Sequence, residues 1–146
     1  MELRDVMTDW VVGSSPESSV REVAELMRER VVGCVVLTTP SGAPVGLVTD
    51  RDLALGVLAD GGSPDDPAIW HASSPVICAH PDMEVSQASD LMVRHGIRRL
   101  PLLEDDALVG IVSLTDLTTR CDADEASRAL EAHAARVALP AQYFRD

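Results

Sequence analysis

The chain has 146 residues, an apolar fraction of 46% and a net charge of −12, which suits one globular domain or two small halves sharing a core. Its basic residues are all arginine. The lack of lysine excludes a Walker-type phosphate loop and Schiff-base chemistry, and an acidic chain without a basic stripe is a poor nucleic-acid binder.

No apolar stretch approaches the roughly 18 residues that span a bilayer. The charged start of the chain is also unlike the apolar core of a signal peptide. We therefore expect a cytoplasmic protein with no membrane contact.

The first half of the chain predicts a strand, a helix, two strands and a helix. These elements are, in order, a strand at Trp10–Gly13, a helix opened by the capping box Ser19-x-x-Glu22, strands at Val35–Leu37 and Val45–Val48, and a helix from Thr49 to Ala59. A polar Gly/Pro stretch follows and reads as a linker.

The second half predicts the same order of elements. Its helix face carries Val85, Ala88 and Met92, its strands are Leu100–Leu103 and Leu108–Val112, and its last helix starts at Ser113. The Ala- and Glu-rich tail Ala123–Ala138 is also predicted to be helical, and it has no counterpart in the first half.

The two halves are copies of one unit. At an offset of 65, Val20 aligns with Val85 and Met27 with Met92; after a one-residue adjustment the offset becomes 64. Val45–Thr49 then aligns with Val109–Ser113, and Asp52 with Asp116. The predicted division is a first repeat at 1–60, a linker at 61–67, a second repeat at 68–122 and a C-terminal helix and tail at 123–146.

A single copy has too few elements to bury its apolar faces. We therefore expect an α+β fold in which two pseudo-symmetric β-α-β-β-α repeats pack sheet to sheet. Such packing would leave two equivalent clefts, one beside each Gly-x-x-Thr/Ser-x-x-Asp segment.

The spacing Thr49-x-x-Asp52 has two readings. Thr49 can be the N-cap of a helix with Asp52 at N3, or both side chains can hold a ligand at a helix N-terminus. Ser113 and Asp116 repeat the same pair in the second copy. The residues between them differ between the copies, so Asp50 and its neighbour are expected on the helix surface.

The repeat resembles the CBS domain, named after cystathionine β-synthase, over residues 1–120. The matching motifs are Asp5-Val6-Met7-Thr8, Gly46-x-x-Thr49-x-x-Asp52, Ile97-Arg98-Arg99-Leu100-Pro101 and Gly110-x-x-Ser113-x-x-Asp116. The resemblance implies a tandem pair, or Bateman module, whose clefts bind an adenosine-containing ligand such as AMP, ADP, ATP, S-adenosylmethionine or an NAD-like molecule, with no obligatory cofactor.

Transferred by position, the resemblance assigns ribose contacts to Asp52 and Asp116, with Thr49 and Ser113 beside them. A carboxylate can accept two hydrogen bonds from a vicinal diol, and the planar guanidinium groups of Arg98 and Arg99 suit phosphate. The adenine would lie between small apolar residues: Val11, Val12, Val32, Val76, Ile77 and Ile97. The first copy has Gly33-Cys34 in place of the two arginines, so we expect one cleft to bind phosphorylated ligands much better.

Nothing in the sequence indicates catalysis or a metal site. The cysteines and histidines lack zinc-ligand spacing, and no nucleophile–base arrangement is visible. The expected function is a regulatory module, not an enzyme, that senses an adenosine ligand, forms a homodimer and acts on a separate, unknown protein. The alternative is a ligand-free scaffold for dimerisation or interaction, in which the aspartates only cap helices.

Overall fold

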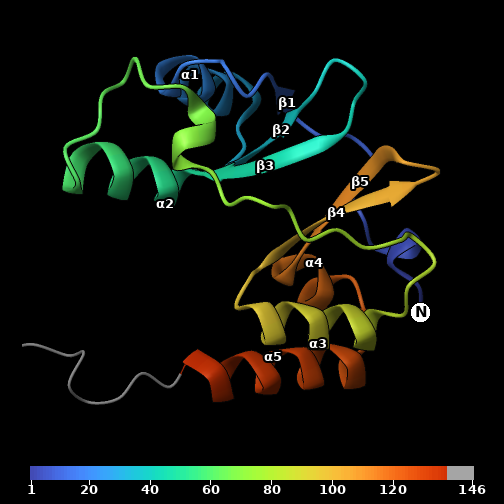
Figure 1. Cartoon of the computed structure of the whole chain (residues 1–146). Helices are drawn as coiled ribbons and strands as arrows, with labels where there is room; N and C mark the ends of the chain where they lie inside the picture. The colour runs from blue at the N-terminus through green and yellow to red at the C-terminus, as the bar shows by residue number, and fades with distance from the viewer. Residues whose placement is uncertain (138–146) are drawn as a thin grey trace, which may run out of the picture. The chain divides into compact units, whose positions relative to one another are not determined.

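The computed structural model describes residues 1–137, and Figure 1 shows the ribbon. The chain forms two compact units. The repeat-1 unit comprises Trp10–Ile77 and Asp105–Val109; the repeat-2 unit comprises Met1–Asp9, Cys78–Glu104 and, among the described residues, 110–137.

The repeat-1 unit is a three-stranded sheet with helices. Its elements are β1 (Gly13–Ser14), α1 (Val20–Arg30), β2 (Cys34–Thr38), β3 (Pro44–Thr49), α2 (Asp50–Leu53), the π-helix η2 (Ala54–Ala59) and the 3-10 helix η3 (Ala68–His71). The strand order is β1-β2-β3. β1 is parallel to β2, and β2 is antiparallel to β3 with Val35 opposite Val48.

The helix α1 begins where its capping residues predict. The Ser19 hydroxyl accepts a hydrogen bond from the Glu22 amide at 3.1 Å, and the Glu22 carboxylate accepts one from the Ser19 amide at 2.8 Å. This reciprocal box satisfies two amides that the helix itself leaves free. The buried face of α1 joins β2, β3 and α2 in one apolar core: Val20, Val23, Met27, Val35, Leu37, Val48, Leu53 and Ala68.

The repeat-2 unit has a two-stranded sheet and three longer helices. Its elements are the 3-10 helix η1 (Leu3–Asp5), α3 (Val85–His95), β4 (Arg99–Glu104), β5 (Ala107–Ser113), α4 (Leu114–Thr119) and α5 (Ala123–Val137). β4 pairs with β5. A single parallel bridge between Ala79 and Leu102 takes the place that β1 has in the repeat-1 unit.

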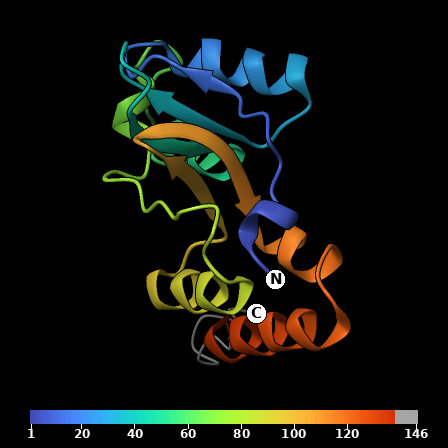
Figure 2. The ribbon, with the colours of Figure 1, turned by 90° about the vertical axis from the view of Figure 1, so that its right-hand side faces the viewer.

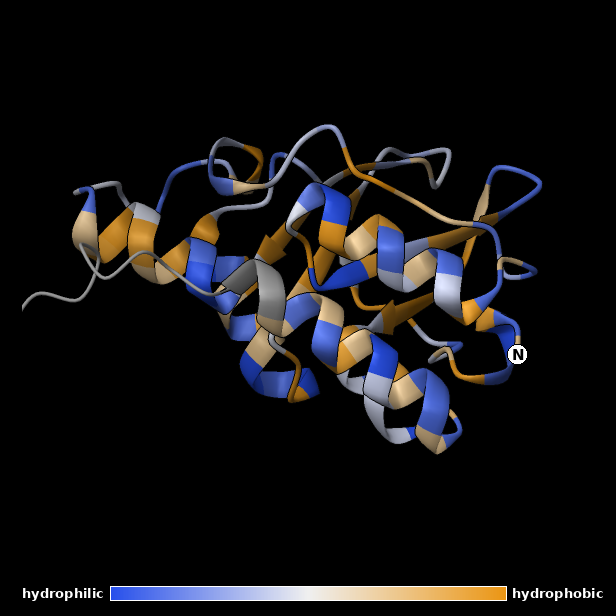
Figure 3. Ribbon diagram, turned by 90° about the horizontal axis from the view of Figure 1, so that it is seen from below, coloured by the Kyte–Doolittle hydropathy of each residue, from blue (hydrophilic) through white to orange (hydrophobic). Residues whose placement is uncertain are grey.

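The tail helix α5 covers the helices of the repeat-2 unit. It packs against α3 and α4, and Figure 2 shows it running beside α3. Ala129 and His133 are its buried side chains among those described. In Figure 3, which is coloured by hydropathy, the helices carry both hydrophobic and hydrophilic residues, as expected of helices with one buried face. The helix predicted from Ala123 is confirmed as far as Val137, and Ala138 lies outside the described residues.

The first residues of each repeat, its leading segment, belong to the compact unit of the other repeat. The segment Met1–Asp9 belongs to the repeat-2 unit, where the backbones of Thr8 and Ile111 exchange hydrogen bonds of 2.9 and 3.0 Å. The leading segment of the second repeat, residues 68–77, lies in the repeat-1 unit. There the backbones of Leu47 and Ser73 exchange hydrogen bonds of 3.1 and 2.9 Å. The sequence predictions did not contain this exchange.

Two predicted elements differ from the observed ones. The strand predicted at Trp10–Gly13 is wrong in extent, because only Gly13–Ser14 forms a strand and Trp10 remains 58% exposed. The helix predicted from Thr49 to Ala59 is α-helical only to Leu53 and continues as the π-helix η2. An α+β fold with two repeats is confirmed, and none of the described helices is long and apolar enough to cross a bilayer.

Candidate ligand-binding site

The first motif places two polar side chains at the start of α2. The Asp52 amide donates to Thr49 Oγ1 at 3.2 Å, and the Thr49 amide donates to Asp52 Oδ2 at 2.8 Å. The predicted cap at Thr49 is therefore confirmed. Among residues 1–137, no hydrogen bond to Asp52 Oδ1 is found, so this half-buried carboxylate keeps an acceptor oxygen available after capping.

The second motif forms the same cap, but its carboxylate has more partners than that of Asp52. Asp116 Oδ2 accepts from the Ser113 amide at 2.7 Å and from the Ser113 hydroxyl at 2.8 Å. Asp116 Oδ1 lies 3.4 Å from Arg120 Nε. Arg120 also donates to the carbonyl of Val6 at 3.1 Å, so it links the motif carboxylate to the leading segment.

The motif glycines are needed by the leading segments. A Cβ on Gly46 would lie 2.9 Å from Ile69 Cδ1 and 3.1 Å from Ala72 Cβ. A Cβ on Gly110 would lie 2.7 Å from Met7 Sδ and 2.9 Å from the carbonyl oxygen of Thr8. Both glycines were visible as parts of the motif, but their physical role requires knowledge of which segment crosses each strand.

The two predicted phosphate-binding arginines lie beside the second motif. Arg98, Arg99, Ser113, Leu114 and Thr115 line a cavity of 150 Å³. The Leu114 amide donates to the carbonyl of Arg98 at 2.8 Å and ties the loop before β4 to the start of α4. Within the described chain, neither arginine has an ion-pair partner, so both guanidinium groups are available to an anion.

The remaining predicted site residues are divided between the units. Val11, Val12, Val32, Val76 and Ile77 share the repeat-1 unit with Thr49 and Asp52, and Ile97 shares the repeat-2 unit with the arginines. All six apolar residues are half-buried. Val12 and Val32 pack against the repeat-1 core, which accounts for part of their burial without a ligand.

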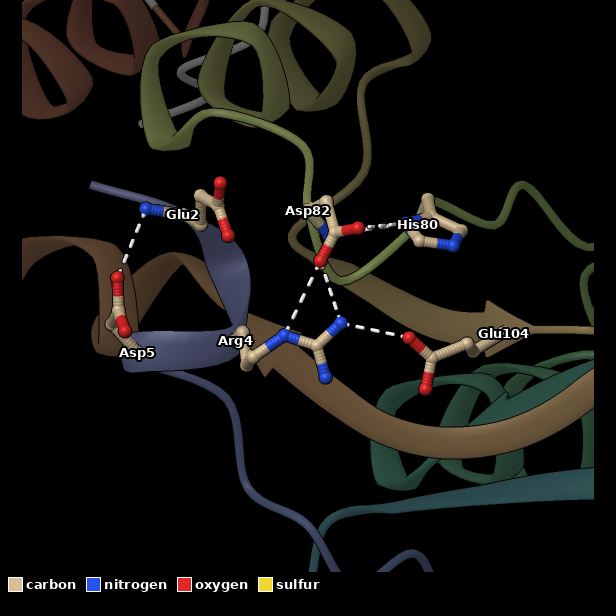
Figure 4. A network of polar contacts seen from close by, with 6 residues as sticks. All are labelled: Glu2, Arg4, Asp5, His80, Asp82 and Glu104. Carbon is tan, nitrogen blue, oxygen red and sulfur yellow. Dashed lines mark hydrogen bonds and ion pairs between the residues drawn. The ribbon is translucent and has the colours of Figure 1, made fainter.

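A separate charged network lies in the repeat-2 unit (Figure 4). Arg4 Nη2 donates to Asp82 at 2.6 Å and to Glu104 at 2.7 Å, and His80 Nδ1 lies 3.6 Å from Asp82. These hydrogen bonds, chiefly that to Glu104, raise the pKa of Arg4, and the bond from Arg4 lowers the pKa of Asp82. His80, Asp82 and Glu104 are spaced closely enough to hold a metal ion, but the guanidinium already supplies their cation.

A second ionisable contact lies near the linker in the repeat-1 unit. His71 Nε2 is 2.9 Å from Asp66 Oδ2, which also accepts a hydrogen bond from the Ser63 amide at 2.9 Å. The hydrogen bond from His71 is the largest cause of the lowered pKa of Asp66, and the Ser63 amide adds to it. The contact fastens the linker to the leading segment of the second repeat.

Comparisons with known proteins identify the family of the chain. The family model for the CBS domain matches residues 3–58 and 69–122. The CBS domain-containing protein YhcV of Bacillus subtilis is 36% identical over 125 residues, covering 86% of this chain and 89% of that protein. An uncharacterized protein of Methanopyrus kandleri is 43% identical over 111 residues, and the match spans 75% of this chain but only 56% of that protein.

A solved structure also matches closely. The CBS domain protein from Pyrobaculum aerophilum, solved in complex with AMP, superposes with a TM-score of 0.78 at 27% identity; the match covers 90% of this chain and 99% of that one. The family model matches the chain twice, and each match contains one capped motif. The chain therefore belongs to the CBS domain family and carries its domains as a tandem pair.

Proposed function

We propose that this CBS pair is a regulatory module that binds an adenosine-containing ligand and changes its affinity for a separate protein. The observation that carries the proposal is the cavity beside Ser113, which is lined by two arginines that have no ion-pair partner among residues 1–137. Helix capping explains the serine and the aspartate, but it does not explain two guanidinium groups at this cavity, to which no carboxylate of the described residues is paired. The AMP complex of the Pyrobaculum relative supports an adenine nucleotide as the ligand class.

Each proposed residue has a defined chemical role. Asp52 and Asp116 accept hydrogen bonds from ribose hydroxyls, and Thr49 and Ser113 keep those carboxylates oriented. Arg98 and Arg99 hold phosphate oxygens through their planar donor groups. Adenine contacts are assigned to the half-buried apolar residues of each unit, which are Val11, Val12, Val32, Val76 and Ile77 in the repeat-1 unit and Ile97 in the repeat-2 unit.

The proposed module acts by binding and carries out no reaction of its own. A sensor needs a ligand that binds two states of the protein with different affinity. We also propose a homodimer, supported by an apolar groove of 490 Å³ between α1 and α2 and by Leu58, which is 84% exposed beside it. Large exposed apolar patches of this kind mark interaction surfaces.

Calorimetry and thermal shift with AMP, ATP, S-adenosylmethionine and NAD test the proposal. A specific ligand at about 100 times its dissociation constant should stabilise the protein by about 2.7 kcal/mol. The double variant Asp52→Asn/Asp116→Asn keeps a side-chain oxygen for each cap but loses the carboxylate charge, so it should fold and lose the shift. The ligand-free scaffold predicts no shift with any compound, or the same shift in the double variant.

A further inference from the structure

The first residue of α2 and the first residue of α4 occupy the same place in the two repeats. Asp50 aligns with Leu114 at the offset of 64. The Asp50 amide donates to the carbonyl of Gly33 at 3.0 Å, and the Leu114 amide donates to the carbonyl of Arg98 at 2.8 Å. The same hydrogen bond therefore fixes the same loop against the same helix start in both units.

The two equivalent places carry side chains of opposite charge. In the second repeat, Leu114 is buried with 8% exposure, and the place holds the cavity that Arg98 and Arg99 line. In the first repeat, the exposed Asp50 folds its carboxylate over the loop: a Cβ on Gly33 would lie 3.0 Å from Asp50 Oδ2. The carboxylate thus lies where the side chain corresponding to Arg98 would start.

The charges around Asp50 leave its carboxylate uncompensated. Asp50 Oδ1 accepts one hydrogen bond, from the Arg51 amide at 2.9 Å, and Asp50 has no ion pair within residues 1–137. The second carboxylate of the motif, Asp52, is two residues away. A phosphate brought to this place meets the like charge of Asp50, whereas at Arg98 and Arg99 it meets two opposite charges.

We infer that the two repeats select adenosine ligands of different charge, and that Asp50 is the specificity-determining residue of the first. The second repeat takes a phosphorylated nucleotide. The first repeat takes an adenosine ligand without a phosphate, because a like charge at the site disfavours the anionic ligand and leaves the uncharged one unaffected. This inference rests on the proposed function and assigns a ligand class to each of its two sites.

The test isolates each site by silencing the other. Calorimetry with AMP and with adenosine is carried out on Asp52→Asn, which leaves the second-repeat site, and on Asp116→Asn, which leaves the first. The Asp52→Asn protein should bind AMP more tightly than adenosine, and the Asp116→Asn protein should show the reverse order. Adding Arg98→Gln and Arg99→Gln to Asp52→Asn should remove the preference for AMP.

The decisive variant is Asp50→Asn in the Asp116→Asn background. It should raise AMP affinity on the order of tenfold at low salt and leave adenosine affinity unchanged, because removal of one like charge affects only the anionic ligand. Asp60→Asn is the matched control, since it removes the same charge from an exposed residue at the end of η2 and should change neither affinity.

Two failures are distinguishable. If the wild-type protein binds none of AMP, ATP, S-adenosylmethionine, NAD and adenosine, the proposed function fails, and the inference fails with it; if it binds one of the others but neither AMP nor adenosine, only the inference is overturned. If it binds AMP and adenosine with the same order of preference in both backgrounds, or if Asp50→Asn and Asp60→Asn have equal effects, only the inference about Asp50 is overturned.

Discussion

Replacing Gly110 by alanine should destabilise the repeat-2 unit, because the leading segment lies directly over that residue. The added Cβ would be 2.9 Å from the Thr8 carbonyl oxygen and 2.7 Å from Met7 Sδ. The sulfur is part of a flexible side chain and can move away. The carbonyl cannot move freely, because it accepts a hydrogen bond of 3.0 Å from the Ile111 amide.

The expected cost follows from these two contacts. Overpacking costs about 1–3 kcal/mol, and weakening the hydrogen bond between Thr8 and Ile111 adds about 0.5–1.5 kcal/mol. The free energy of unfolding should therefore fall by about 1.5–4.5 kcal/mol, as measured by urea unfolding followed by circular dichroism. Adding Met7→Ala should restore only the part of the loss that comes from the sulfur.

Gly13→Ala is the matched control for Gly110→Ala. Its Cβ would meet the carbonyl oxygen of Val36 at an ordinary 3.5 Å, so its stability should stay within about 1 kcal/mol of the wild type. If Gly110→Ala is as stable as this control, the leading segment does not press on β5, and the physical explanation of the motif glycine is wrong.

Further predictions concern the cap and the linker. Ser113→Ala should lower the free energy of unfolding by about 0.5–2 kcal/mol, and Ser113→Thr, which restores the residue type of the first motif, should recover most of it in the same urea assay. The lowered pKa of Asp66 means that its stabilisation is present above the unfolded pKa of about 3.9 and is lost as pH falls through the folded value. Asp66→Asn should therefore destabilise at pH 7 and approach the wild type at acidic pH, whereas the exposed neighbour variant Asp65→Asn should show no such pH-dependent difference; equal curves for both variants would refute the role of His71.

The local features of this fold could be predicted from the sequence. The boxes at Ser19, Thr49 and Ser113 are confirmed, because a cap depends on residues only three positions apart. Arg98 and Arg99, which the sequence analysis names as candidate phosphate ligands, line one cavity with Ser113. Their roles toward a ligand stay predictions.

Features that depend on distant parts of the chain were missed. The exchange of leading segments brings Thr8 to Ile111, and no local spacing encodes a contact across so many residues. The predicted strand at Trp10–Gly13 failed because apolar content alone does not supply a neighbouring strand along its whole length. Asp50 was expected to be a plain surface residue of a helix. It is exposed, but only the structure shows its carboxylate lying on Gly33.

The exchange of leading segments has a consequence for how such a protein can be divided. Each compact unit contains residues from both repeats. Cutting the chain at the linker would therefore separate Gly46 and Gly110 from the leading segments that pack against them. The smallest fragment that contains all of these contacts is the pair of repeats. A gene segment encoding one repeat alone would have to find its missing piece on another molecule, and the tandem arrangement provides that piece within the same polypeptide.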